Sequence, residues 1–166
     1  MDIDAFVRLI DHDGLSAPGV EAVSAFEAAN GLILPDDYKA FLAATPGGRL
    51  SKQVNFSLCG DEVGNEYLGR VAGLRDDPSY SLEQRVATAE EKAIPEGLLS
   101  IMTDKGGNPI AISVRPDRFG EIFFLDHEVS DEGRATIEAA EGDDWGYAIP
   151  FASSFTEMVA GFKEED

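Results

Sequence analysis

Three short apolar segments separated by glycine-containing turns occupy residues 98–125 of the chain. In the middle segment Ile110, Ile112 and Val114 alternate with other residues, as in a strand that buries one face. The turns between the segments, at residues 104–108 and 115–120, are short, so neighbouring strands are most simply antiparallel. The pattern therefore predicts an antiparallel meander with strands at residues 98–103, 110–114 and 121–125.

The segment LPDDYKAFLAATPGG, residues 34–48, predicts a helix with a defined start and stop. Pro35 suits the first turn because the amide that proline lacks would be unpaired there, and Asp36 and Asp37 lie at the positive end of the helix dipole. Pro46 prevents the helix from continuing, and Gly47-Gly48 turns the chain toward a strand. The stripe expected to be buried consists of Tyr38, Phe41 and Leu42.

Four further segments carry helical signals. The expected helices span residues 3–10 (ended near Gly14), 18–30, 82–91 and 154–162. Ser81 with Gln84, and Ser154 with Glu157, have the spacing of a capping box at a helix start. The second helix is expected to bury Val20, Val23 and Phe26 on one face and to stop at Asn30-Gly31. The last one is expected to bury Phe155, Met158, Val159 and Phe162.

Residues 54–80 give a weaker signal. Val54, Phe56 and Leu58 alternate with polar or small residues and predict a half-buried strand. Residues 60–80 contain several glycines and acidic residues, which favour a long surface excursion with one short strand at Tyr67-Leu68.

Length and composition predict one α+β domain that spans residues 1–166, without linker or repeat. No apolar run approaches the ~18 residues that a membrane-spanning helix needs. The N-terminus is acidic, whereas a signal peptide begins with basic residues. The single cysteine, Cys59, cannot form an internal disulfide, which fits a reducing compartment. We therefore expect a cytoplasmic protein.

The charge of the chain is its least ordinary property. Thirty-two acidic residues against thirteen basic ones give a net charge of −19. Nucleic-acid binding is disfavoured, because phosphates are bound by lysines and arginines gathered on one face. The charge instead suits a basic protein partner. The alternative is that the excess serves only solubility, as in many acidic proteins.

Several short motifs, in order along the chain, resemble the SUKH superfamily, which comprises killing-toxin-resistance and cell-wall-assembly-regulator domains. They cover residues 18–162, and one position departs from the pattern: Pro46 stands where the family often has asparagine before the double glycine. The matching positions are Phe26-Glu27, Asn30-Gly31, Leu34-Pro35, Tyr38, Phe41-Leu42, Gly47-Gly48, Asp104, Gly107-Asn108, residues 120–124, Asp126-His127-Glu128 and Ser154-Phe155.

The resemblance implies a fold and a role. The fold is α+β, with a curved antiparallel β-sheet flanked by N-terminal helices and a C-terminal helix. Bacterial members are mostly immunity proteins that bind and silence a cognate polymorphic toxin, often a nuclease or another nucleic-acid-targeting enzyme with a basic active site. The expected partner is then the toxin's catalytic domain, not a nucleic acid or a membrane. Two alternatives stay open, a regulatory or scaffolding module without a toxin partner and an acidic hydrolase.

Two acid-rich segments are candidates for contact with the partner. The first acidic patch consists of Asp61, Glu62, Glu66, Asp76 and Asp77, flanked by the possible aromatic anchors Tyr67 and Tyr80. The second acidic patch consists of Asp126, Glu128, Asp131, Glu132, Asp143, Asp144 and Trp145. For both patches the alternative is a solvated charged segment that touches no partner.

Motifs for catalysis, metals or cofactors are weak. In an extended chain Asp126 and Glu128 would share one side while His127 points away, which supplies at most part of a hard-cation site. The glycines at 104–108 precede a strand, whereas a phosphate-binding loop precedes a helix, so a hairpin turn is expected. Cys59 has no basic neighbour in sequence to activate it. We expect no enzymatic activity, no cofactor and no metal.

Overall fold

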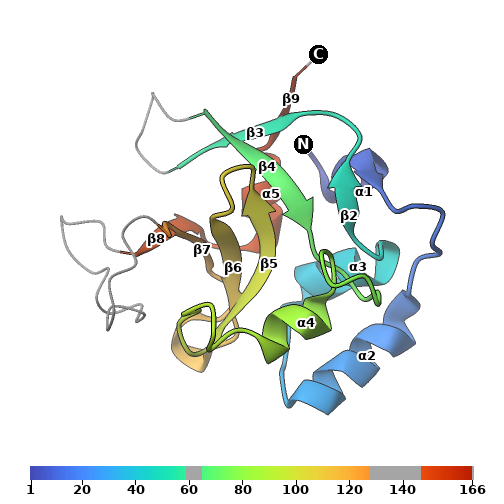
Figure 1. The fold of residues 1–166 in the computed structure, drawn as a ribbon, viewed down its shortest axis with the longest axis vertical. Coiled ribbons are helices and arrows are strands. Elements are labelled where there is room, and N and C mark those ends of the chain that lie inside the picture. The colour runs from blue at the N-terminus through green and yellow to red at the C-terminus, as the bar shows by residue number, and fades with distance from the viewer. Residues whose placement is uncertain (59–64, 128–146, 166) are drawn as a thin grey trace.

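The computed structural model describes residues 1–58, 65–127 and 147–165, and in them nine strands form one open sheet (Figure 1). The main path runs β1-β2-β4-β5-β6-β7-β8, while β3 pairs with β4 and with β9. The strands are β1 Ile10–Asp11, β2 Gly48–Leu50, β3 Val54–Ser57, β4 Asn65–Val71, β5 Leu98–Asp104, β6 Pro109–Ser113, β7 Ile122–Leu125, β8 Ala148–Ala152 and β9 Lys163–Glu164. Every pair of named strands is antiparallel, so the predicted α+β class and meander are confirmed.

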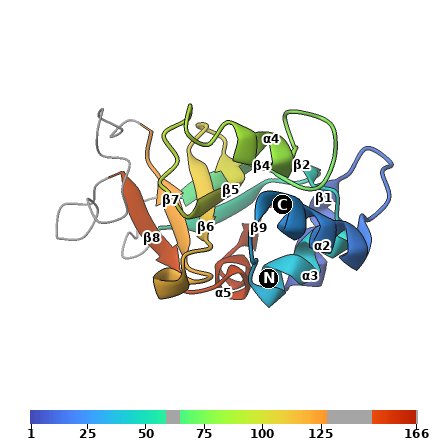
Figure 2. The ribbon, with the colours of Figure 1, turned by 90° about the horizontal axis from the view of Figure 1, so that it is seen from below.

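Helices lie on both sides of this sheet (Figure 2). The described helices are α1 Ile3–Leu9, α2 Gly19–Asn30, α3 Asp36–Ala44, α4 Leu82–Ala87, α5 Phe155–Ala160 and the 3-10 turn η1 Pro116–Arg118. Seen from below, α3 and α5 lie on one side of the sheet and α4 lies on the other (Figure 2). The opposite face therefore remains open beside α4, and this face carries the groove described below.

The core between the sheet and the helices is largely aromatic. Phe41 on α3 lies 5.7 Å from Phe6 on α1 and 4.8 Å from Phe155 on α5, measured between ring centroids. Phe6 also meets Phe162 edge-on at 5.1 Å. The predicted buried stripe Tyr38, Phe41 and Leu42 is fully buried. Burial of one such aromatic side chain stabilises the fold by roughly 2–3 kcal/mol. Because these rings contact one another, helices α1, α3 and α5 pack as one unit.

The helix start and stop signals of residues 34–48 are confirmed. The helix begins after Pro35, and the Asp37 carboxylate accepts hydrogen bonds from the amide and hydroxyl of Thr156 at the start of α5, both at 2.9 Å. The double glycine is required by close packing. A Cβ on Gly47 would lie 2.6 Å from the Val71 carbonyl oxygen, and one on Gly48 would lie 2.1 Å from the Asp11 carbonyl oxygen. Only glycine lets β2 fit between its two neighbours.

The surface excursion predicted at residues 60–80 is corrected in its described part, because the short strand expected at Tyr67-Leu68 is present but is longer and central. β4 spans seven residues there and pairs with β2, β3 and β5, so it is a central strand. Gly69 permits a close approach of two strands and marks no turn, because a Cβ there would lie 2.4 Å from the Asp104 carbonyl oxygen. Leu68 and Val71 are buried in the core.

Smaller corrections concern element ends and faces. The first helix stops at Leu9 because the chain enters β1, and the 82–91 helix stops at Ala87. Val20 is 73% exposed, since it lies on the outer face of α2, whereas Val23 and Phe26 are buried as expected. The strand at Val54 ends at Ser57 and buries Asn55 as well as its apolar residues, because β4 and β9 flank it on both sides.

Both capping predictions hold. The Ser81 hydroxyl accepts a hydrogen bond from the Gln84 amide at 3.2 Å, and the Ser154 hydroxyl accepts one from the Glu157 amide at 3.1 Å. Gly31 ends α2 in the left-handed conformation, with φ 63°. The strands β1, β8 and β9 were not predicted, because two of them have only two residues and the third contains Pro150.

Candidate partner-binding surface

The structure brings one residue of each acidic patch together. Glu66 lies near the start of β4, and Asp126 directly follows β7. Burial raises the pKa of Glu66, and the nearby charges of Asp104 and Asp126 raise it further. Within the described part of the chain, no cationic side chain pairs with Glu66. Three carboxylates thus share one region although sequence places them in three separate segments.

The turn between β5 and β6 fixes this region. The Asp104 carboxylate accepts hydrogen bonds from the backbone amide and the side-chain amide of Asn108, both at 2.7 Å. The Asn108 side-chain oxygen in turn accepts one from the His127 amide at 3.0 Å. The hairpin predicted at residues 104–108 is confirmed by the pairing of Thr103 with Pro109. The same turn therefore holds the chain directly after Asp126, which is the one described residue of the second acidic patch.

Tyr67 makes its contacts within the chain. Its hydroxyl donates a hydrogen bond to the Glu165 carboxylate at 3.1 Å, which also accepts from Asn55 and Gln53. The Lys105 ammonium lies 5.1 Å from the centroid of the Tyr67 ring. The aromatic side chain is half-buried by these contacts. An anchoring contact with a partner would have to use the remaining exposed part of its ring.

The rest of the described first acidic patch lies at the other end of β4. The six residues from Glu66 to Val71 span roughly 17 Å in an extended strand. Beyond them, Asp76 is exposed, and Asp77 lies 3.8 Å from the Arg75 guanidinium. Arg75 also lies 5.1 Å from the centroid of the Tyr80 ring. The first acidic patch is therefore not one continuous surface. Its two described parts are separated by the central strand.

Several candidate residues lie outside the described part of the chain. They are Asp61, Glu62, Glu128, Asp131, Glu132, Asp143, Asp144 and Trp145, and Cys59 is also among the residues not described. Within the described residues, no group of three or more histidine, cysteine or acidic side chains could hold a metal ion. In the same part of the chain, no helix combines the length and apolarity needed to cross a bilayer.

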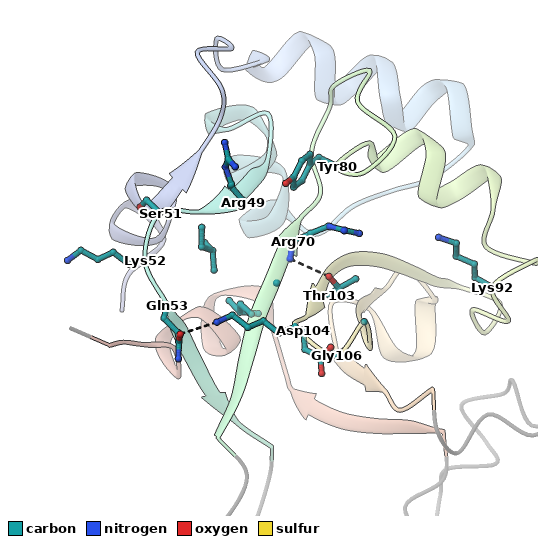
Figure 3. Close-up of a pocket in the computed structure, with 15 residues that line it drawn as sticks. Arg49, Ser51, Lys52, Gln53, Arg70, Tyr80, Lys92, Thr103, Asp104 and Gly106 are labelled. Atoms are coloured by element: carbon teal, nitrogen blue, oxygen red, sulfur yellow. Dashed lines mark hydrogen bonds between the residues drawn. The ribbon is translucent and has the colours of Figure 1, made fainter.

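A cationic groove on the open face of the sheet is the feature that sequence reasoning missed. The groove has a volume of about 710 Å³ and lies over β2, β4 and the β5–β6 turn (Figure 3). Among the described residues that line it, Asp104 is the one acid, and Asn108 already holds its carboxylate. The basic residues that line it are Arg49, Lys52, Arg70, Lys92 and Lys105. They come from four separate segments, so no sequence motif could have identified them.

A β-bulge directs one of these side chains into the groove. In the pairing of β4 with β5, Leu68 faces Asp104 and Val71 faces Met102, so Gly69 and Arg70 together oppose Thr103. The Arg70 amide donates a hydrogen bond to the Thr103 hydroxyl at 3.3 Å. A bulge of this kind redirects a side chain relative to the regular alternation of a strand. Arg70 consequently points into the groove while Leu68 and Val71 remain in the core.

Comparison with known proteins identifies the family of the chain. The sequence profile of the SMI1 / KNR4 family (SUKH-1) matches residues 18–161, which include almost all of the described sheet and four of the five α-helices. A comparison with curated proteins gives no match. Helix α1 and strand β1 precede the matched segment, although Phe6 belongs to the same core. By the length of this match, the chain belongs to the SMI1 / KNR4 family (SUKH-1).

Proposed function

We propose that this protein is an immunity protein that binds a cognate bacterial toxin and neutralises it without catalysing a reaction. The observation that carries the proposal is membership in the SMI1 / KNR4 family (SUKH-1), which supports an immunity protein or a related protein-binding module. Residues 1–166 act as one cytoplasmic domain in this proposal. Helix α1 supports that part, because Phe6 packs against Phe41 of the matched segment and against Phe162, which directly follows it.

The proposed toxin class comes from the family resemblance, and the charge of the chain supports it. A nuclease active site attracts phosphates and is therefore basic, so a protein with a net charge of −19 would be steered toward it. Glu66 suits this role because its carboxylate lies near Asp104 and Asp126, and no cation among the described residues pairs with it. A lysine or arginine of the toxin would relieve the repulsion among these acids. The proposed contact surface is therefore centred on Glu66 and Asp126.

The first experiment is co-expression with the C-terminal domain of a toxin encoded by the adjacent gene. The proposal expects that growth is rescued and that the two proteins purify as a stoichiometric complex. Equal killing with and without this protein would refute the immunity role. A pull-down that recovers host proteins, together with equal killing, would indicate the regulatory module instead.

The second experiment tests the contact surface. Glu66→Gln removes one charge from the proposed surface, whereas Glu21→Gln removes one exposed charge on α2, outside both acidic patches. The association rate with the toxin domain should fall for Glu66→Gln and stay unchanged for Glu21→Gln. It should also fall as salt rises, because the Debye length shortens to about 8 Å at physiological ionic strength. An association rate independent of salt and of both substitutions would exclude this electrostatic surface.

A further inference from the structure

Three cations of the open face share one pocket, and no carboxylate in the described part of the chain pairs with them. Arg70 comes from β4, Arg85 from α4, and Lys92 from the segment after α4. None of the three forms an ion pair with a described residue, although the chain has 32 acidic side chains and only 13 basic ones. By contrast, Arg49 and Arg75 each contact two carboxylates. An acidic chain that leaves three cations together unpaired has room there for an external anion.

The pocket has the lining of an oxyanion site. Its volume is about 150 Å³, and it shares Arg70, Lys92, Thr103 and Gly107 with the larger groove. Arg70 and Lys92 extend toward each other from opposite sides (Figure 3). No described residue that lines the pocket is acidic. The hydroxyl groups that line it belong to Ser79, Thr88, Ser100 and Thr103.

Arg85 shows that positive charge is kept here at a cost. Its guanidinium donates one hydrogen bond to the Ser100 hydroxyl at 2.9 Å, and the described residues offer it no carboxylate. Burial lowers the pKa of Arg85 to about 10, and the neighbouring charge of Arg70 also lowers it. A buried guanidinium is ordinarily paired with an acid, because desolvation disfavours its charged form.

The register of the sheet adds a second like-charge contact. Arg49 on β2 stands directly opposite Arg70 on β4, so both side chains lie on the same face. Like charges at facing positions of an antiparallel pair destabilise it. Arg49 is held by Asp11 and Asp13, at 3.3 and 3.5 Å, and still lines the groove. The positive charge thus continues from the small pocket into the larger groove.

We propose that this pocket binds the phosphoryl group of an anionic ligand, with Arg70, Arg85 and Lys92 as its cationic contacts. A single carboxylate would leave most of the three positive charges uncompensated, whereas a phosphoryl group carries up to two negative charges and accepts several hydrogen bonds. The groove beyond Arg70 can hold a second phosphoryl group. The inference does not depend on the proposed function, because it concerns a different surface and a ligand of opposite charge.

Long nucleic acids do not suit this site. The net charge of −19 repels an extended polyanion, while a small anion meets mainly the local cations. The phosphoryl group can therefore belong to a small diphosphate or to a phosphorylated side chain of a protein. The chemistry recognised is the same in both sources.

The test uses the full chain and calorimetric titration at two salt concentrations. The probes are inorganic pyrophosphate, a phosphoserine peptide and a hexaglutamate peptide. Pyrophosphate or the phosphoserine peptide should bind with 1:1 stoichiometry, and the tighter of the two identifies the source. Hexaglutamate should bind at least tenfold more weakly. Equal binding of hexaglutamate, or no binding of either phosphorylated probe at millimolar concentration, would overturn the proposal.

Substitutions locate the binding. Arg70→Gln and Lys92→Gln change exposed side chains, so the fold should survive, and each should weaken binding roughly tenfold, the usual effect of losing a charge-assisted hydrogen bond. Arg8→Gln is the matched control, because it removes an exposed positive charge from α1, outside the groove. If Arg8→Gln weakens binding as much as Arg70→Gln does, only the net charge matters and the assigned pocket is wrong.

Discussion

Replacing Arg85 by methionine should make the protein more stable. Arg85 is partly buried on α4, and among the described residues its side chain donates one hydrogen bond, to the Ser100 hydroxyl. Burial lowers its pKa from its ordinary value to about 10, so keeping the guanidinium charged costs roughly 3 kcal/mol of folding free energy. Because the charged form is the disfavoured one, this cost applies in full at every pH below about 10. Methionine retains much of the apolar packing of the side chain without the charge.

The gain is partly offset by lost hydrogen bonding. Loss of the contact with Ser100 costs about 1 kcal/mol, and leaving the buried Ser100 oxygen without its donor costs about 1 kcal/mol more. The net expectation for Arg85→Met is a gain of roughly 1–2 kcal/mol, which raises Tm by about 2–8 °C for a chain of this length. Urea unfolding at pH 7, followed by circular dichroism, measures the free energy directly.

Ser100→Ala is the matched control for this prediction. It leaves the guanidinium in place but removes its hydrogen-bond acceptor, so it should destabilise the protein by about 1 kcal/mol. The reasoning would be refuted if Arg85→Met lowered the free energy of unfolding by 1 kcal/mol or more, because the guanidinium would then stabilise the fold. A stabilised Arg85→Met variant that no longer binds pyrophosphate would show that the site is maintained at the expense of stability.

Three further changes test the packing and the charges. Tyr38→Phe removes a buried hydroxyl that has no hydrogen-bond partner among the described residues, so the free energy of unfolding in urea should rise by about 1 kcal/mol. A fall in that free energy would mean that the hydroxyl is paired. Gly69→Ala places a methyl group 2.4 Å from the Asp104 carbonyl oxygen and should lower the free energy of unfolding by roughly 2–3 kcal/mol in the same assay. The control Gly106→Ala meets only side-chain atoms at 3.4 Å and should cost far less. Equal costs would contradict the close-approach argument. Glu66→Gln should stabilise the protein by about 0.5 kcal/mol at pH 7, because the raised pKa of Glu66 means that folding disfavours its charge. That gain should vanish in acid, where Glu66 is protonated in both states, and a gain that persists in acid would exclude a charge effect.

Local signals predicted those elements whose stability is local. The helix of residues 34–48 has its proline, its acids and its glycines within one short segment, and the structure follows each of them. The meander of residues 98–125 could be predicted because strands that pair in it are also neighbours along the chain. β4 was predicted only as a short strand at Tyr67-Leu68, since its glycine is explained by a contact with Asp104, which lies 35 positions later in the sequence.

The same distinction applies to the candidate surfaces. Acidic residues are frequent throughout the sequence. Choosing segments by their density of charge made Glu66 and Asp126 candidates, but it could not show that the two carboxylates lie together. The cationic groove could not be predicted in this way, because its residues are scattered among many acids along the chain. Strand register and one bulge bring them to one face, and neither can be read from composition.

The position of α1 has a practical consequence for dissecting the protein. A fragment cut to the boundaries of the family match would begin at Pro18 and lack both α1 and the edge strand β1. The ring of Phe6 would no longer separate Phe41 from solvent, and the amide of Ser51 would lose its acceptor at Leu9. Such a truncated polypeptide would expose an aromatic surface prone to aggregation, and β2 would lose its pairing with β1. A shortened version of the protein should therefore keep the first seventeen residues.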